Sequence, residues 1–582
     1  MNTYFDSIPR PEYPRPQMLR EDWINLNGSW EFEMDFGRSG KERKLFTIDK
    51  LQDVILVPFC PESKLSGIEY TDFIPAVWYR RSFIIPDDWV DSRVLIHFGA
   101  VDYESEVWIN GASAGTHKGG YSSFSFDITE YIQTGENIVT VYAEDDVRSG
   151  LQPRGKQRAE HHFIKAGCDY TRTTGIWQTV WLERVPKEYI SSFKVIPDPD
   201  NQSVHIKSLL KGNTDNLTFR VQAAYDGRDV GQAQAIITGN RVSLTVNLEE
   251  KHLWEPGVPN LYDLELTLEN GNKAIDRVTS YFGLRSVSLG KDVTNINGKP
   301  VFQRLVLDQG FYPDGIYTAP TDEDLRKDIG ISLALGFNGA RLHEKVFEPR
   351  FLYWADKMGY LVWGEHANWG LDIDTPMGLR QFLPEWMEVL ERDFNHPSIV
   401  GWCPFNETWD KDGKKQDNEV LRIVYNVTKA IDTTRPVIDT SGNYHVVTDI
   451  FDIHDYDQDP ESLAKKLEPM KTSEGAYVTF ENRQKYEGQP YFVSEYGGIW
   501  WNPGDKKGWG YGTRPKSEEE FLARYKGLTE LLLKHPRVCA FCYTQLYDIE
   551  QEVNGLYTYD RKPKFDPEII KAINNQKAAI EE

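Results

Sequence analysis

Cysteine is scarce in this chain: its 582 residues contain only five, at positions 60, 168, 403, 539 and 542. An odd and scattered set does not build a disulfide framework, so reduced thiols and a cytoplasmic location are expected. Cys539 and Cys542 form a CxxC pair, but no second pair accompanies it and it lies in an apolar run typical of a strand. A metal or redox site is therefore not predicted there.

Long apolar runs are also missing, so no membrane-spanning helix is predicted. Residues 1–7 (MNTYFDS) carry neither a basic nor an apolar segment, and no secretory signal is expected at this end. The net charge of −23 argues against nucleic acid or an anionic membrane as a partner. Aromatic residues, by contrast, are abundant, with 17 Trp, 30 Tyr and 28 Phe. Most should fill strands and cores, and a few could stack on sugar rings.

The length exceeds what one hydrophobic core supports, and the patterning divides the chain into three parts. Residues 1–184 contain many short alternating strands broken by turn residues, which predicts a β-sandwich of jelly-roll type. Residues 185–285 repeat the pattern on a smaller scale and suit an immunoglobulin-like β-sandwich. Residues 286–582 alternate strands and helices, which predicts a (β/α)₈ TIM barrel.

Eight apolar runs mark the expected barrel strands, ending at residues 307, 339, 364, 404, 438, 453, 493 and 543. Amphipathic stretches at 322–335 and 518–533 predict two of the helices between them. Ser517 stands where the N-cap of the second helix is expected.

Glu407 and Glu495 each follow an apolar run, at the point where a buried strand meets its loop. In a parallel barrel both would open on the C-terminal face, where such barrels place their chemistry. Two carboxyl groups facing each other across a sugar are the machinery of glycosidic bond cleavage. A surface salt bridge is the alternative for any single Glu, but both strand-end positions favour catalysis.

The surroundings of the two carboxyl groups differ. Trp402, Pro404 and Phe405 give Glu407 an apolar approach, which is expected to raise its pKa and keep its proton. Tyr456, at a neighbouring strand end, could donate a hydrogen bond to Glu495 and favour its ionised form.

Several segments, in this order and spacing, make the chain resemble glycoside hydrolase family 2, whose members include β-galactosidases, β-glucuronidases and β-mannosidases. The matching segments are residues 26–30 (LNGSW), 174–183 (TGIWQTVWLE), 338–343 (NGARLH), 406–407 (NE), 494–498 (SEYGG) and 545–557 (QLYDIEQEVNGLY). The resemblance covers nearly the whole chain and implies a compact three-domain glycosidase.

The resemblance implies Glu407 as acid/base and Glu495 as nucleophile of a retaining, exo-acting enzyme with a covalent glycosyl intermediate. It implies that Asn406 binds the sugar 2-hydroxyl, and that Asp169 reaches the sugar from the first domain. Arg341 could orient Glu495 by a charge-assisted bond. Other candidate substrate-binding residues stand at strand ends or in the following loops: His343, His366, His454, Tyr456, Trp500, Trp501 and Arg561. For the histidines and tryptophans, ordinary packing is an equal alternative.

No cofactor is expected. His343, His366 and His454 show neither helical i,i+4 spacing nor an HExxH motif, so no metal site is predicted. Some family members use Mg²⁺, but retaining chemistry does not require it. Family members are often symmetric oligomers, so a homo-oligomer stays open.

The sugar is the least determined feature. Family β-glucuronidases carry an Asn-x-Lys signature near the barrel end, where residues 553–557 here read VNGLY without the lysine. Because a carboxylate needs a placed cation, this disfavours β-glucuronide. The resemblance makes β-galactoside the first choice, since that activity is common in the family. β-Glucuronide, β-mannoside, α-L-arabinoside and β-glucoside remain alternatives, as do transglycosylation and a non-catalytic carbohydrate-binding role.

Overall fold

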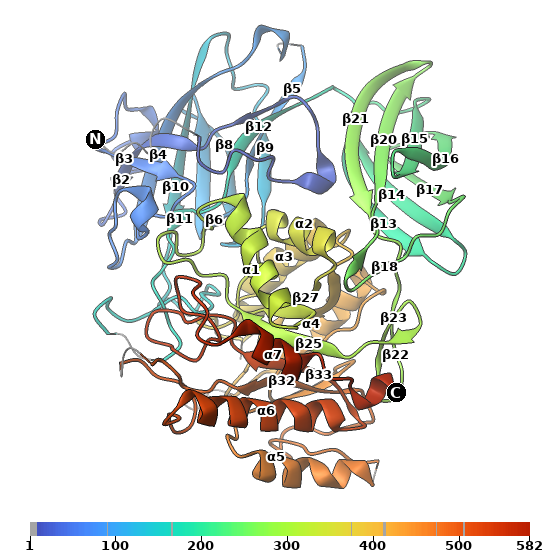
Figure 1. Ribbon diagram of the computed structural model, residues 1–582. Coiled ribbons are helices and arrows are strands. Elements are labelled where there is room, and N and C mark those ends of the chain that lie inside the picture. The colour runs from blue at the N-terminus through green and yellow to red at the C-terminus, as the bar shows by residue number, and fades with distance from the viewer. Residues whose placement is uncertain are drawn as a thin grey trace.

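The structure is a computed structural model that describes residues 8–89, 91–164, 167–373, 375–410, 415–472, 474–503 and 507–582. Two β-sandwiches, blue and green in Figure 1, sit above an α/β barrel drawn in yellow to red. The predicted three-part fold class is confirmed. Residues 1–7, on which the expectation about a secretory signal rests, lie outside the described residues.

The first sandwich packs a six-stranded sheet against a four-stranded one. The larger sheet has the order β3–β2–β4–β10–β7–β8 (Asp53–Val57, Gly28–Met34, Ala76–Ile84, Glu136–Glu144, Glu104–Ile109, Ala112–Lys118). The smaller has the order β1–β12–β5–β9 (Trp23–Asn25, Val180–Val185, Arg93–Phe98, Phe124–Asp127). The short pair β6 (Val101–Asp102) and β11 (Gly175–Ile176) lies beside them. Apolar side chains from both inner faces, including Trp30, Tyr79 and Ile96, make one core.

The second sandwich has sheets of three and four strands. Their orders are β13–β14–β17 (Tyr189–Asp198, Ser203–Lys211, Arg241–Asn247) and β16–β15–β20–β21 (Arg228–Ile236, Thr218–Tyr225, Tyr262–Asn270, Lys273–Phe282). Alternating burial along β14 and β15 shows why period-two sequences form these strands. Short strands β18 (Trp254–Glu255), β19 (Val258–Pro259) and β22–β24 (Val287–Leu289, Thr294–Ile296, Lys299–Pro300) lead to the barrel.

Seven parallel strands form the main barrel sheet in the order β28–β27–β26–β25–β33–β32–β31. They are Ile399–Cys403, Leu361–Glu365, Gly339–Leu342, Gln303–Asp308, Val538–Thr544, Tyr491–Gly497 and Phe451–Asp455. The remaining position is taken by residues 437–441, through a bridge to Trp402 and the pair β29 (Phe405–Asn406) and β30 (Thr440–Ser441). The second barrel strand, β26, begins at Gly339. The sequence predicted that the apolar run would end there, but the strand continues through the buried Arg341 to Leu342.

Helices cover the outside of the barrel. They are α1 (Asp322–Ala334), α2 (Pro349–Met358), α3 (Pro376–Asp393), α4 (Asn418–Ile431), α5 (Pro460–Leu467), α6 (Glu518–Lys534) and α7 (Pro567–Asn574). The predicted N-cap is confirmed, since the Ser517 hydroxyl accepts a hydrogen bond from the Glu520 amide. Among the residues described, no helix is long and apolar enough to cross a membrane.

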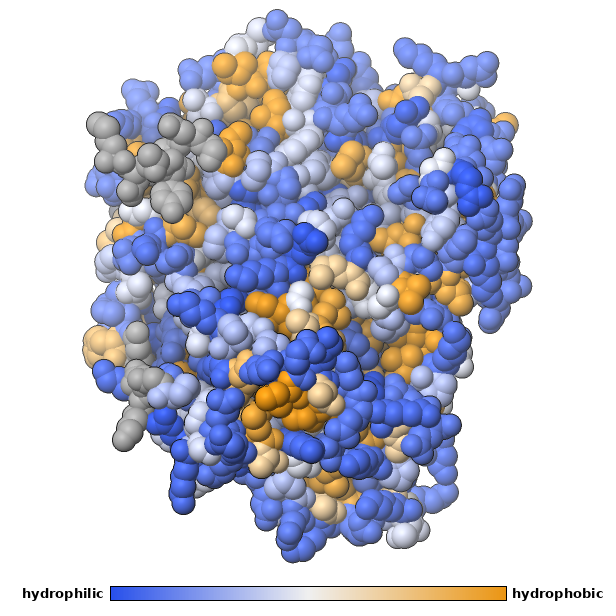
Figure 2. Space-filling view, viewed as in Figure 1, coloured by the Kyte–Doolittle hydropathy of each residue, from blue (hydrophilic) through white to orange (hydrophobic). Residues whose placement is uncertain are grey.

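Hydrophilic residues cover most of the face seen in Figure 2, and apolar residues form scattered groups on it. All five cysteines are free thiols, four of them buried. Burial raises the pKa of the Cys539 thiol to about 12, which makes it unreactive.

A buried arginine joins the two sandwiches. Arg20 donates to Glu183 of the first at 3.2 Å and to Asp276 of the second at 2.9 Å. All three side chains are almost completely buried. Removing the guanidinium would take a positive partner from two buried carboxylates. That lowers the free energy of unfolding far more than breaking an exposed ion pair does.

We expect Arg20→Met to destabilise the protein by about 3–5 kcal/mol. The exposed pair of Arg38 and Asp146 provides the control, since Arg38→Met should cost about 0–1 kcal/mol. Thermal unfolding of both variants measures the difference. Equal shifts in Tm would contradict the role assigned to Arg20.

Candidate active site

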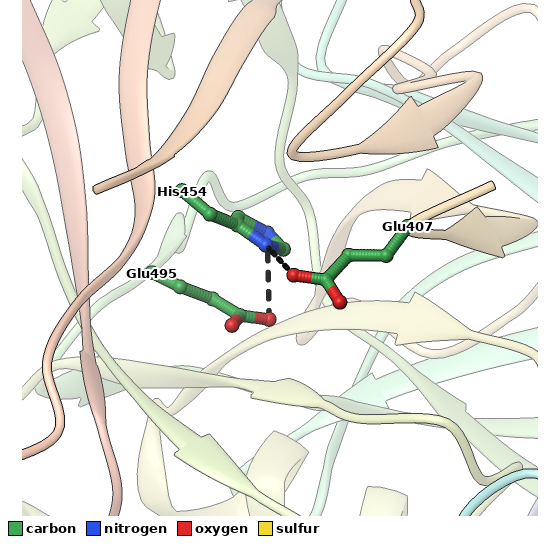
Figure 3. A group of neighbouring side chains, drawn as sticks. All are labelled: Glu407, His454 and Glu495. Atoms are coloured by element: carbon green, nitrogen blue, oxygen red, sulfur yellow. Dashed lines mark hydrogen bonds and ion pairs between the residues drawn. The ribbon is translucent and has the colours of Figure 1, made fainter. Parts of the chain in front are cut away.

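The C-terminal ends of the barrel strands bring the two predicted catalytic carboxyl groups together. Glu407 follows β29, Glu495 lies in β32, and an oxygen of each falls within 4.8 Å of the other. His454, at the end of β31, lies between them (Figure 3). Three separate segments of sequence therefore build one cluster.

Arg341, on β26, connects the same strand ends. Its guanidinium donates to Glu365 Oε1 at 2.6 Å, to Glu495 Oε1 at 3.1 Å and to Asn406 Oδ1 at 3.2 Å. It also donates to the Ser494 carbonyl at 2.7 Å. The predicted bond between Arg341 and Glu495 is thus present, and it holds one face of the nucleophile candidate in place.

The backbone at Glu407 adopts an uncommon conformation. Its φ of +47° lies in the left-handed region, which costs energy for a residue with a side chain. The Glu407 amide donates to the Ser441 carbonyl at 3.0 Å, which fixes this turn against the neighbouring strand. Such strain, held by surrounding bonds, is typical of functional positions.

His454 contacts both carboxyl groups. Its Nδ1 lies 2.7 Å from Glu407 Oε1, and its Nε2 lies 3.4 Å from Glu495 Oε1 and 3.0 Å from the Ser441 hydroxyl. The pairing of β31 with β32 shifts register between Ile453 and His454, directly at this side chain. Gly442, at φ +89°, packs directly on the imidazole, where any β-carbon would collide with the ring.

The expected rise in the pKa of Glu407 is wrong for this arrangement. Burial alone would raise that pKa, but the hydrogen bond and charge of His454 outweigh it and lower it to about 2. Burial opposes the charged imidazole too, yet the carboxylates of Glu495 and Glu407 raise the pKa of His454. The proton of the free site therefore resides on His454, a contact that the apolar sequence before Glu407 could not reveal.

Glu495 has the partners expected of a nucleophile. The Tyr456 hydroxyl donates to its Oε2, as predicted from the sequence. The Tyr456 ring stacks on Tyr511 with centroids 3.5 Å apart, which fixes the position of the hydroxyl. His343 lies 3.2 Å from Glu365, and burial together with the charge of Lys156 holds its pKa well below the usual range. His343 is thus a neutral member of the site.

Asn406 is positioned through its backbone and its carbonyl oxygen. Its amide N–H donates to Asn368 at 2.6 Å, and its side-chain oxygen accepts from Arg341. No described residue contacts its side-chain NH₂, which leaves two donors for a ligand. Binding of a sugar hydroxyl there stays a prediction.

A loop of the first domain contacts the barrel near the candidate site, and binding of a sugar by its Asp169 stays a prediction. Asp169 pairs with Arg154 at 3.1 Å, and Tyr170 donates from its hydroxyl to Glu552 of the barrel. Lys156 is 5% exposed, and its ammonium lies 3.6 Å from the Cys168 sulfur and 3.5 Å from the centre of the Trp369 ring. Burial disfavours its charge, but neighbouring acidic groups, first Cys168 and then Glu344, raise the pKa of Lys156.

The barrel end supplies a further carboxyl group. Glu552 is buried and accepts from the Asn554 side chain at 2.8 Å, close to where the family glucuronidases carry their lysine. Burial raises the pKa of Glu552, and the Tyr170 hydrogen bond opposes this rise.

Three predicted substrate-binding residues contact other protein groups. Arg561 donates to Asp328 on α1 at 3.0 and 2.9 Å and to two backbone carbonyls. His366 is buried 3.4 Å from Glu385 on α3, among aromatic rings. Trp501 packs on Phe521 and Phe565. These contacts favour a packing role, and binding of substrate by any of the three stays a prediction.

Trp500 is half-buried, with the Arg514 guanidinium 6.0 Å from its ring. Its role in walling the pocket stays a prediction.

Sequence patterns missed Lys156, Glu365 and Trp409. Glu365 ends the third barrel strand and could have been found by the same strand-end argument as Glu407. Trp409 stands two residues after Glu407 and donates from Nε1 to Glu407 Oε2 at 3.3 Å. Lys156 comes from another domain, and no local signal marked it.

Glu407, His454 and Glu495 could together coordinate a metal ion, since their ligand atoms lie within 4.8 Å of one another. The 2.7 Å hydrogen bond between Glu407 and His454 already uses two of these atoms. The expectation that no metal is required stays a prediction.

We expect His454→Gln to raise the pKa of Glu407 from about 2 toward or above its ordinary value, because a neutral partner no longer offsets burial. Infrared titration of the carboxyl groups measures this. Subtracting spectra of the matching Glu407→Gln variants isolates the Glu407 signal in each background. A Glu407 titration unchanged by the His454 substitution would contradict the assignment.

Comparison with known proteins bears on this geometry. The chain matches models of glycosyl hydrolases family 2 over residues 64–186 (sugar binding domain), 188–285 and 296–576 (TIM barrel domain). It is 26% identical to the β-glucuronidase of Rattus norvegicus over 540 residues, 83% of this chain and 79% of that protein. It is 27% identical to the β-galactosidase of Priestia megaterium over 529 residues, 81% of this chain and 47% of that protein.

The chain spans less than half of that β-galactosidase, and 46% of a relative from Formosa agariphila that is 27% identical over 401 residues. Among solved structures, a Bifidobacterium dentium β-glucuronidase complexed with coumarin-3-O-glucuronide superposes with a TM-score of 0.80 at 20% identity, covering 96% of this chain and 97% of that one. That likeness supports the fold. With three consecutive domain models matched in order, the chain belongs to glycosyl hydrolases family 2 and is a glycoside hydrolase.

Proposed function

We propose that the protein is an exo-acting, retaining β-glycosidase with Glu495 as nucleophile and Glu407 as acid/base. The observation that carries this proposal is the short distance between their carboxyl oxygens, within 4.8 Å. Retaining enzymes hold the two carboxyl groups about 5–5.5 Å apart, whereas inverting enzymes leave about 6.5–9.5 Å for a water molecule.

The surroundings support the two roles. Arg341 and Tyr456 donate to different oxygens of Glu495, which orients its carboxyl group for attack on the anomeric carbon. Glu407 then protonates the leaving oxygen and, after departure of the leaving group, takes a proton from the attacking water. His454, whose Nδ1 lies 2.7 Å from Glu407, passes its proton to Glu407 before the first step, and the proton that Glu407 takes from the water restores the starting state.

For the glycone, we propose a neutral sugar, with β-galactoside first. Glu552 is a buried carboxyl group near the barrel end, and burial, with a smaller contribution from the charge of Glu495, raises its pKa. A carboxyl group there accepts hydrogen bonds from sugar hydroxyls and repels the carboxylate of a uronic acid. The missing lysine of the Asn-x-Lys signature points the same way.

β-Glucuronide is the second candidate, and two observations favour it. Several relatives, including the R. norvegicus protein, are β-glucuronidases. The buried Lys156 ammonium also has no carboxylate within 4.0 Å among the described residues, so it could pair with that of a uronic acid.

We expect Glu407→Gln to lower kcat for an aryl β-glycoside by about 10²–10⁴-fold, because deglycosylation then lacks a general base. With a good leaving group, the covalent intermediate should accumulate, and mass spectrometry of the digested protein should find the sugar on Glu495. Glu495→Gln is the control and should form no adduct. An adduct elsewhere, or an inverted product anomer seen by NMR, would refute the mechanism.

A panel of aryl glycosides identifies the sugar. We expect kcat/KM for the β-galactoside to exceed that for the β-glucuronide, because Glu552 and the catalytic pair disfavour an anionic glycone. A higher value for the β-glucuronide would overturn this choice. If Lys156→Met then abolished turnover of the glucuronide alone, the Lys156 ammonium would be the partner of its carboxylate.

A further inference from the structure

An exposed aromatic side chain stands directly beside the candidate acid/base. Trp409 is 48% exposed, and its Nε1 donates to Glu407 Oε2 at 3.3 Å. The other oxygen, Oε1, is bound by His454, which lies between Glu407 and Glu495 (Figure 3). Trp409 therefore contacts Glu407 through Oε2, the oxygen that is not hydrogen-bonded to His454.

Two further rings fix Trp409 in place. Its centroid lies 5.9 Å from Tyr444 and 5.3 Å from Phe480, both edge to face, and these two rings lie 5.3 Å apart. Each partner has a left-handed backbone, with φ of +52° at Tyr444 and +57° at Phe480. Three loops thus hold a rigid ring whose exposed surface receives no apolar cover in the described chain.

Polar side chains border the cluster of Trp409, Tyr444 and Phe480. Arg483 pairs with Asp410, the residue after Trp409, and its guanidinium lies 4.1 Å from the centre of the Tyr444 ring. An aromatic face with charged hydrogen-bonding groups at its border suits a ring that is apolar on its face and hydroxylated around its rim.

The reaction supplies such a ring. In a retaining exo-glycosidase the glycone lies between the two carboxyl groups, and the atom that Glu407 protonates belongs to the leaving group. The first ring of that group must therefore lie beside Glu407, on the side away from Glu495. The bond of Trp409 to Oε2, the oxygen of Glu407 that His454 does not bind, favours this side for its ring.

We propose that Trp409, braced by Tyr444 and Phe480, forms a leaving-group subsite on which the second sugar ring of a β-linked oligosaccharide stacks. This inference rests on the proposed glycosidase activity and names the substrate class of that site. It makes oligosaccharides, rather than simple alkyl glycosides, the favoured substrates.

The test compares a β-linked disaccharide with the methyl glycoside of the same glycone. Both need protonation by Glu407, but only the disaccharide presents a leaving ring. Trp409→Ala should lower kcat/KM for the disaccharide about 3- to 10-fold more than for the methyl glycoside. Trp409→Phe keeps an aromatic face and removes the N–H, so it should preserve the wild-type ratio of the two substrates.

Equal losses with both substrates in Trp409→Ala would overturn the proposal, because Trp409 would then act only through its bond to Glu407. A selective loss confined to an aryl glycoside would also overturn it, in favour of an aromatic leaving group. If the wild type turned over no glycoside, the proposed function would fail separately. Calorimetric binding of the disaccharide to Glu495→Gln, with and without Trp409→Ala, would then decide on the subsite, since equal affinities would refute it.

Discussion

The site depends on one buried guanidinium. Arg341 is 1% exposed, and its donors reach Glu365 on β27, Glu495 on β32 and Asn406 on β29. An unpaired charge in this position would be very costly, so the folded barrel must present these acceptors to it. Because the planar guanidinium fixes the directions of its bonds, three strands that are distant in sequence acquire one common geometry. Stability of the barrel and alignment of the nucleophile thus have the same origin.

The protonation state of Glu407 is set by its contact with His454 and not by the apolar residues that precede it in the sequence. Glu407 follows an apolar run, yet the imidazole of His454 makes it a carboxylate in the free site. The same ring approaches Glu495 at 3.4 Å, so one imidazole links two carboxyl groups that need different protonation states during a retaining reaction.

The sequence was informative at several strand ends, although Glu365, at the end of the third barrel strand, was missed. The fold class, both catalytic candidates, and the bonds that Arg341 and Tyr456 make to Glu495 could all be predicted from apolar runs followed by polar residues. The sequence is less informative where a side chain's direction depends on a distant partner. Arg561 contacts Asp328 and Trp501 contacts Phe565, which no local pattern encodes. Lys156 was missed for the same reason, because it lies against Trp369 of the barrel as well as Cys168 of its own domain.

The pocket is also a domain boundary. Lys156, Asp169 and Tyr170 belong to the first domain, and Tyr170 is hydrogen-bonded to Glu552 of the barrel. Arg158 and Glu550 form an ion pair across the same contact at 3.0 Å. A tilt between the two domains would break these contacts without unfolding either domain, so the positions of Lys156 and Asp169 relative to the barrel depend on how the domains dock. The N-terminal sandwich thus helps to define the surroundings of the two carboxyl groups, although it supplies neither of them.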